Sequence, residues 1–142
     1  MTITKGHYTG FYKYNKERIQ KIIAHDKTLF FIDINDTDGE KFSGTIQDDI
    51  NTGGTPGIGT ITGKINGDKI FFVKQMPIAA IITNDVQKNF NKKHRKIYYD
   101  GIKSDGIFKG TWKLKFGFIF FGLLPILIAE TRGTWEMKKK SI

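Results

Sequence analysis

Apolar and polar residues alternate along most of the chain, in short runs separated by turn dipeptides. Because successive side chains of a strand point to opposite faces, this period of two predicts half-buried β-strands. The runs are rich in β-branched and aromatic residues, which strands favour. The pattern predicts eight strands, at residues 6–15, 27–35, 40–50, 57–66, 68–76, 95–103, 105–115 and 128–139.

The turns between these runs predict how the strands are connected. Asn66-Gly67 is a strong hairpin signal, because both central positions of a type I′ turn need a positive φ; Asp38-Gly39 and Asp105-Gly106 are similar. Consecutive hairpins form an antiparallel meander, and eight strands close around either side chains or one small ligand. We therefore expect an all-β, eight-stranded antiparallel up-and-down β-barrel as a single domain over residues 1–142.

A glycine recurs between two large apolar residues, in the pattern apolar-x-Gly-x-apolar. It is centred on Gly10, Gly44, Gly63 and Gly110, with a shorter match at Gly133. Residues two apart in a strand share a face, so each glycine faces the core. Such a glycine is tolerated mainly where the sheet bends or another backbone comes close. The repetition predicts a sheet that curls on itself into a barrel.

Three stretches break the alternation. Residues 16–26 fit either a short helix or a further edge strand, and residues 77–94 fit either a helical plug or a mobile loop. Residues 116–129 contain no charged residue, yet they are fewer than the about 20 that a membrane-spanning helix needs.

The uncharged stretch at 116–129 has several interpretations, all of which place it at a barrel rim. It forms a plug over one end, a portal lid above an apolar ligand, a homodimer contact, or a shallow insertion into a membrane beside the lysine clusters. Its candidate portal or interface residues are Phe118, Phe120, Phe121, Leu123 and Leu124. In one alternative for the whole protein, the barrel is filled and the chain is an interaction module acting through this loop.

Two charged residues fall on the inward face. Asp48 continues the inward positions of its strand, and Lys74 faces inward if Phe72 and Met76 do. A buried carboxylate needs a partner, so Asp48 and Lys74 are a candidate internal pair. The pair is either a structural salt bridge near one end of the barrel or a polar anchor for a ligand head group.

Inward aromatic residues complete a candidate ligand site. In this hypothesis Tyr12, Trp112 and Trp135 line the interior, while Asp48, Lys74 and Tyr99 supply polar anchoring. An enzyme using Asp48 and the tyrosines for acid-base chemistry is the weaker hypothesis, because an inward position alone does not establish catalysis.

The net charge of +9 comes from twenty lysines and three arginines against 14 acidic residues. Most lysines occupy alternate positions of the predicted strands, which is typical of a solvated outer wall, and we expect no specific nucleic-acid partner. Two denser clusters fit either a solvated surface or an acidic partner such as nucleic acid or an anionic membrane. They comprise Lys88, Lys92, Lys93, Arg95 and Lys96, and the run at 138–140.

Other motifs are absent or incomplete. The chain has no cysteine, and its first residues lack the apolar segment of a secretory signal, so we expect a cytoplasmic protein. The glycine-rich stretch at 53–59 lacks the lysine and hydroxyl spacing of a phosphate loop, and the three histidines are widely separated. We expect neither a metal nor a cofactor.

The closing strand, Gly133-Thr134-Trp135-Glu136-Met137-Lys138, and the Gly-Thr-Trp at 110–112 carry a family resemblance. With the eight-stranded meander, they resemble the calycin superfamily of lipocalin-like barrels, and in particular small bacterial lipocalin-like proteins of undefined role. Lipocalins commonly carry Gly-x-Trp on the first strand, where this chain has Gly10-Phe11-Tyr12. The resemblance implies non-enzymatic binding of a small apolar or amphipathic molecule inside the barrel.

Overall fold

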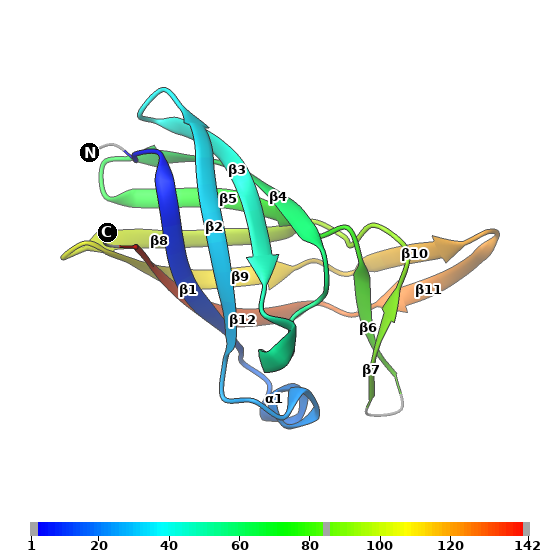
Figure 1. Cartoon of the computed structure of the whole chain (residues 1–142). Helices are drawn as coiled ribbons and strands as arrows, with labels where there is room; N and C mark the ends of the chain where they lie inside the picture. The colour runs from blue at the N-terminus through cyan, green and yellow to red at the C-terminus, as the bar shows by residue number, and fades with distance from the viewer. Residues whose placement is uncertain (1–2, 84–85, 141–142) are drawn as a thin grey trace.

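The computed structural model describes residues 3–83 and 86–140. Within them the chain forms twelve strands, one α-helix and one short 3₁₀ helix (Figure 1). In chain order they are β1 (Gly6–Tyr14), α1 (Glu17–Ile23), β2 (Thr28–Thr37), β3 (Lys41–Asp48), the 3₁₀ helix η1 (Ile50–Thr52), β4 (Ile58–Asn66), β5 (Lys69–Gln75), β6 (Ala79–Thr83), β7 (Val86–Phe90), β8 (Ile97–Ser104), β9 (Ile107–Leu114), β10 (Gly117–Phe121), β11 (Leu124–Ile128) and β12 (Thr131–Lys139).

Eight of the described strands pair in a closed antiparallel barrel, in the order β1-β12-β9-β8-β5-β4-β3-β2. Apart from two inserted hairpins, strands that follow one another in the chain are neighbours, and β12 closes the ring against β1. The predicted all-β, eight-stranded up-and-down barrel is therefore confirmed. The bounds of each predicted strand differ by at most three residues from those of an observed strand.

The inward glycines mark places where neighbouring backbones come very close. A Cβ atom on Gly44 would lie 1.8 Å from the carbonyl oxygen of Asp33, and one on Gly133 would lie 1.8 Å from that of Lys13. A Cβ on Gly110 would lie 1.9 Å from a carbonyl oxygen of β8. Because backbone cannot move aside as a flexible side chain does, any side chain here would obstruct the coiling of the sheet. The predicted reason for the repeated glycine is confirmed.

Aromatic side chains fill the middle of the barrel. Phe72 stacks on Tyr99 with ring centroids 4.6 Å apart, and Trp135 packs edge-on against both, at 5.2 and 5.6 Å. The indole Nε1 of Trp135 donates to the backbone carbonyls of Asp100 and Thr111, at 3.0 and 3.1 Å. This part of the interior is packed solid.

Three insertions gather at one end of the barrel (Figure 1). Helix α1 follows β1, so the helical alternative for residues 16–26 is the observed one. The expectation of a helical plug or mobile loop at 77–94 is wrong, because β6 and β7 pair as a hairpin. The alternate residues Ala79 and Ile81 are buried against the neighbouring hairpin, which favours a strand here. Residues 84 and 85, within that predicted connection, lie outside the described residues.

The uncharged segment forms a second hairpin, β10–β11, which projects away from the barrel (Figure 1). One of its faces packs against β6–β7 in a small separate core, in which Phe90 and Phe121 lie 5.1 Å apart. The segment is thus at the rim, as expected, but it extends outward instead of folding over the end. No helix among the described residues is long and apolar enough to cross a membrane.

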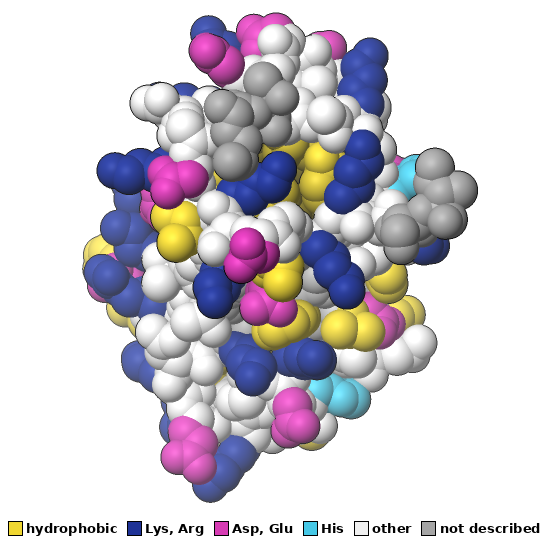
Figure 2. Space-filling model, turned by 90° about the vertical axis from the view of Figure 1, so that its left-hand side faces the viewer, with side chains coloured by type: hydrophobic (Ala, Val, Ile, Leu, Met, Phe, Trp, Pro, Cys, Tyr) yellow, Lys and Arg dark blue, Asp and Glu magenta, His cyan; other side chains and the backbone are white. Residues whose placement is uncertain are grey.

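Lysine, arginine and acidic side chains are interspersed on the side of the molecule away from β10–β11 (Figure 2). Outward positions of the barrel strands also carry charges; in β12, for example, Arg132 and Lys138 are exposed. Mixed charges of this kind are typical of a solvated wall.

Replacing Gly133 with alanine should destabilise the barrel. Its new methyl group would meet the Lys13 carbonyl and the Trp112 indole, so we expect the free energy of unfolding to fall by about 1 to 3 kcal/mol, the usual cost of overpacking. Urea denaturation measures the change, and Thr134→Ala, at the adjacent exposed position, is the matched control. Equal stability of Gly133→Ala and the control would contradict the close-approach explanation.

Candidate functional site

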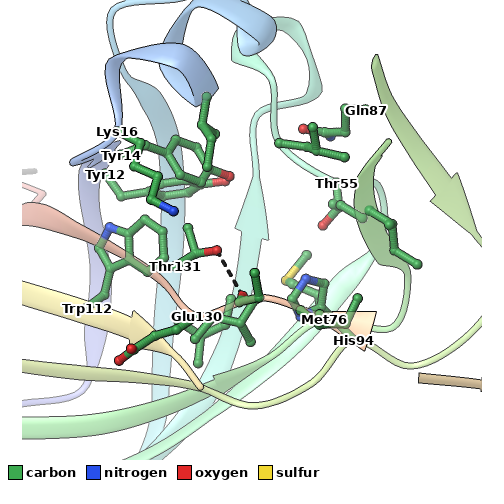
Figure 3. Close-up of a pocket in the computed structure, with 18 of the residues that line it drawn as sticks. Tyr12, Tyr14, Lys16, Thr55, Met76, Gln87, His94, Trp112, Glu130 and Thr131 are labelled. Atoms are coloured by element: carbon green, nitrogen blue, oxygen red, sulfur yellow. Dashed lines mark hydrogen bonds between the residues drawn. The ribbon is translucent and has the colours of Figure 1, made fainter. Parts of the chain in front are cut away.

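A cavity of about 220 Å³ opens at the end of the barrel that carries the insertions (Figure 3). The barrel strands supply its floor and one wall. Helix α1, the β6–β7 hairpin, the loops before β4, β6 and β8, and the end of β11 with the residues joining it to β12 supply the rest. The insertions therefore deepen the barrel mouth into a partly enclosed cavity. A larger hollow, of about 670 Å³, lies on the outer wall over β4, β5, β8 and β9, but its lining includes outward lysines and it lies outside the barrel.

The floor of the cavity contains the buried ion pair. The Nζ atom of Lys74 lies 2.8 and 2.9 Å from the two carboxylate oxygens of Asp48, and the two residues are only 1% and 4% exposed. Strand β4 lies between β3 and β5, so the two side chains meet inside the barrel across an intervening strand. The predicted contact between Asp48 and Lys74 is confirmed.

Tyr12 binds both members of this pair. Its hydroxyl donates to Asp48 Oδ2 at 3.4 Å, and Lys74 Nζ lies 4.7 Å from the centre of its ring. The ammonium group therefore contacts a carboxylate and an aromatic face at once, which offsets part of the cost of burying a charge. Each charge is balanced by the other, so the floor is close to neutral overall.

Two consecutive glycines close the chain over Asp48. A Cβ atom on Gly54 would lie 2.4 Å from the Cβ of Asp48, and one on Gly53 would lie 2.2 Å from Ile23 of α1. Gly53 also has a φ of 95°, which glycine adopts without strain. The glycine-rich stretch thus has a packing role: it lets the segment after η1 lie directly against the ion pair.

One wall is an aromatic cluster from β1 and β9. Tyr12 and Tyr14 lie 5.9 Å apart edge-on, and each packs against Trp112, at 5.9 and 5.2 Å. The Trp112 Nε1 donates to the carbonyl of Lys13 at 3.0 Å, which fixes the indole. In Figure 3 the hydroxyls of both tyrosines point toward the middle of the labelled group. This wall is formed mainly by apolar ring surfaces, and the two tyrosine hydroxyls add polar atoms to it.

Burial keeps the cavity tyrosines protonated. It raises the pKa of Tyr14 to about 12 and that of Tyr12 and Tyr99 well above the ordinary value, and the nearby Asp48 carboxylate raises all three further. At neutral pH these hydroxyls are neutral and able to donate hydrogen bonds.

The opposite wall includes Met76, Thr55 and His94 (Figure 3). The His94 Nδ1 lies 2.7 Å from the carbonyl of Arg95, and since a carbonyl can only accept, Nδ1 carries the proton. Burial lowers the pKa of His94, so the neutral ring presents Nε2 as an acceptor. The Thr55 hydroxyl is buried without a hydrogen-bond partner among the described residues.

The structure brings most of the predicted site residues together. Tyr12, Asp48, Lys74, Tyr99 and Trp112 line the cavity. Trp135 lies deeper, in the solid part of the barrel, where its indole is held by two carbonyls.

The predicted portal residues do not line the cavity. Phe118, Phe120, Leu123 and Leu124 are exposed on the hairpin, and Phe121 packs against β7. From this hairpin it is Leu127 and Ile128 that reach the lining.

Several lining residues were not among the predicted site residues. Tyr14 follows the same alternation as Tyr12, so the pattern contained its signal. Thr55 and His94 lie in loops, where no periodicity indicates which way a side chain points.

The fold and site define a class: an eight-stranded antiparallel barrel with an aromatic cavity over a buried ion pair. Scans against models of protein families, curated proteins and solved structures found no match.

Removing one member of the ion pair should destabilise the protein strongly. Lys74→Met leaves the Asp48 carboxylate buried without its partner, so we expect a loss of about 3 to 5 kcal/mol in the free energy of unfolding. The double variant Asp48→Asn, Lys74→Met should lose less than the two single variants combined. A double-mutant cycle by urea denaturation measures this coupling.

The matched control for that cycle is the exposed pair between Glu130 and Arg132, whose charged atoms lie 2.7 Å apart. Glu130→Gln should change stability by about 1 kcal/mol or less. If Lys74→Met proves as mild as this control, the central role of the buried pair is refuted.

Acid should destabilise the folded state through His94. The unfolded state takes up a proton near the ordinary pKa of about 6.5, whereas the folded state has a lowered pKa and resists protonation. The free energy of unfolding should therefore fall as the pH drops through 6.5 toward the folded-state pKa. Urea denaturation across this range should show a weaker dependence for His94→Gln than for the exposed control His25→Gln; identical curves would contradict the assignment.

Proposed function

We propose that this protein binds a small, uncharged amphipathic molecule in the cavity at the open end of the barrel. The observation that carries the proposal is an aromatic cavity whose lining includes a buried hydroxyl, that of Thr55, with no hydrogen-bond partner among the described residues. The side chains of His94 and Tyr99 add further polar groups to the same lining. A mainly apolar pocket with a few convergent polar groups is typical of small-molecule sites.

The cavity volume limits the size of the ligand. An apolar cavity of roughly 150 Å³ takes up benzene, while sites for drug-sized ligands begin at about 300 Å³. At about 220 Å³ the cavity suits a single ring or a short chain with one polar group.

The polar side chains of the cavity indicate the chemistry of the ligand's polar group. The charges of Asp48 and Lys74 already compensate each other, so neither of these two buried groups requires a charged ligand. Tyr99 offers a neutral donor and His94 an acceptor, and both side chains line the cavity. A hydroxyl or an amide, which both donates and accepts, satisfies the two together.

The resemblance to lipocalin-like barrels supports the same proposal. Those barrels bind small apolar molecules within an eight-stranded meander of this kind. Here the aromatic core around Trp135 fills the deeper part, so the ligand is held near the mouth.

Native mass spectrometry of the full chain, purified without detergent, should reveal the natural ligand. We expect a one-to-one adduct with the mass of a ring-sized organic molecule, which solvent extraction then identifies. A bare protein mass that also persists after incubation with benzyl alcohol would contradict the proposal.

Binding of benzyl alcohol gives a test that does not depend on the natural ligand. Trp112 lines the cavity and Trp135 does not, so benzyl alcohol should change the fluorescence of Trp135→Phe and leave that of Trp112→Phe unaltered. Ala80→Trp, which fills the cavity, should abolish binding, whereas Thr134→Trp on the outer wall should not. His94→Ala should lower the affinity for benzyl alcohol by about 2- to 10-fold, the worth of one hydrogen bond. It should leave the affinity for toluene, which has no hydroxyl, unchanged.

A further inference from the structure

One face of the β10–β11 hairpin is apolar and uncovered. The strand pairing places Phe118 opposite Leu127 and Phe120 opposite Pro125, so these four share the face that points away from β6–β7. Phe118, Phe120 and Leu127 are 47%, 56% and 55% exposed. Residues of the other face pack against the neighbouring hairpin, so the hairpin has a stable support and an exposed side.

The apolar face continues from the base of the hairpin to its tip. Phe116 and Phe118 lie 6.0 Å apart and Phe118 and Phe120 lie 6.4 Å apart, forming a row of rings. The tip is a two-residue turn in which Gly122 has a φ of 62° and Leu123 is 99% exposed. An uncharged, fully projecting apolar surface of this kind marks an interaction site.

Cations cap the outer edge of strand β10. The Nζ of Lys92 donates to the carbonyl of Phe120 at 2.7 Å, and the Arg95 guanidinium donates to those of Phe118 and Phe116 at 3.2 and 3.4 Å. These carbonyls are the ones that another strand would use to pair with β10. Because lysine and arginine side chains occupy them, extension of the sheet by a second copy of the chain is obstructed.

The segment that borders the hairpin, from its base to Phe120, is strongly basic. The segment 91–96 between β7 and β8 contains four cationic residues and no acidic one, and Lys115 directly precedes β10. On the side of the molecule away from the hairpin, by contrast, acidic and basic side chains are interspersed (Figure 2). An apolar hairpin beside a cationic segment matches an anionic bilayer. The acyl region of the bilayer accepts the apolar hairpin, and the anionic head groups attract the cationic segment.

We propose that the β10–β11 hairpin inserts its tip and its phenylalanine face into the surface of an anionic membrane, with the 91–96 segment against the lipid phosphates. The end of the same hairpin, at Leu127 and Ile128, lines the cavity. Insertion therefore holds the cavity mouth at the bilayer surface. The proposal goes beyond ligand binding and rests on Phe118, Phe120, Leu123 and the lysines of the 91–96 segment, none of which lines the cavity.

Tryptophan fluorescence on vesicles tests the insertion. Trp112 and Trp135 are only 4% and 2% exposed, so vesicles should not change their emission. A change in emission of Leu123→Trp therefore reports on the surroundings of the new tryptophan at the tip. With vesicles of phosphatidylcholine and phosphatidylglycerol, its emission should shift to the blue and be quenched by brominated acyl chains. Phe31→Trp, at a 49% exposed position of the barrel wall, is the matched control and should show neither effect.

Co-sedimentation of the full chain with vesicles separates the contribution of the phenylalanine face from that of the cationic segment. Phe118→Ser and Phe120→Ser should each weaken binding on the order of tenfold, the worth of one buried phenylalanine, whereas Phe31→Ser should not. Binding should be stronger with phosphatidylglycerol present than with phosphatidylcholine alone, and it should weaken as salt rises. The double variant Lys93→Glu, Lys96→Glu should bind vesicles with and without phosphatidylglycerol almost equally.

Two results would overturn the proposal. One is no binding to anionic vesicles at low salt by a protein that is folded by circular dichroism. The other is a dimer in analytical ultracentrifugation that Phe118→Ser dissociates, which would assign the face to a second copy. Neither result bears on benzyl alcohol binding, so failure of the insertion and failure of the cavity function are distinguishable.

Discussion

The buried ion pair between Asp48 and Lys74 marks the depth at which the interior of this barrel changes character. Below it the space is filled by packed apolar and aromatic side chains; above it lies the cavity. The two charges are stable there because each neutralises the other and Tyr12 contacts both. Burial raises the pKa of the surrounding tyrosines, and the Asp48 carboxylate raises it further. The pair therefore supports the fold and determines the chemistry of the site.

The barrel was predictable from the sequence because both of its determinants are local. Alternation gives the face of each side chain, and the inward glycines indicate where strands coil closely, as at Gly44 and Gly133. The β6–β7 hairpin was not predictable, because the apolar run Ile78–Ile82 has no clear period and fits a helix or a strand equally. Its form depends on the β10–β11 hairpin, which buries Ala79 and Ile81 from a distant part of the chain.

The same distinction applies to the site. Alternation correctly brought Asp48 and Lys74 to the inside, where they meet. It gives the face of a residue but not its depth along the barrel, so Trp135 shares a face with the cavity residues and yet lies below them. His94 and Thr55 come from loops, and their positions follow from the assembled tertiary structure.

The structure thus combines an aromatic cavity, for which we propose a small amphipathic ligand, with an apolar hairpin that leads away from its mouth. The most direct test of the cavity is an NMR measurement of intermolecular nuclear Overhauser effects between benzyl alcohol and the protein. The account predicts contacts from the ligand ring to Trp112 and Met76 and none to Trp135. Contacts confined to Phe118 and Phe120 on the hairpin, with none to Trp112, would contradict it.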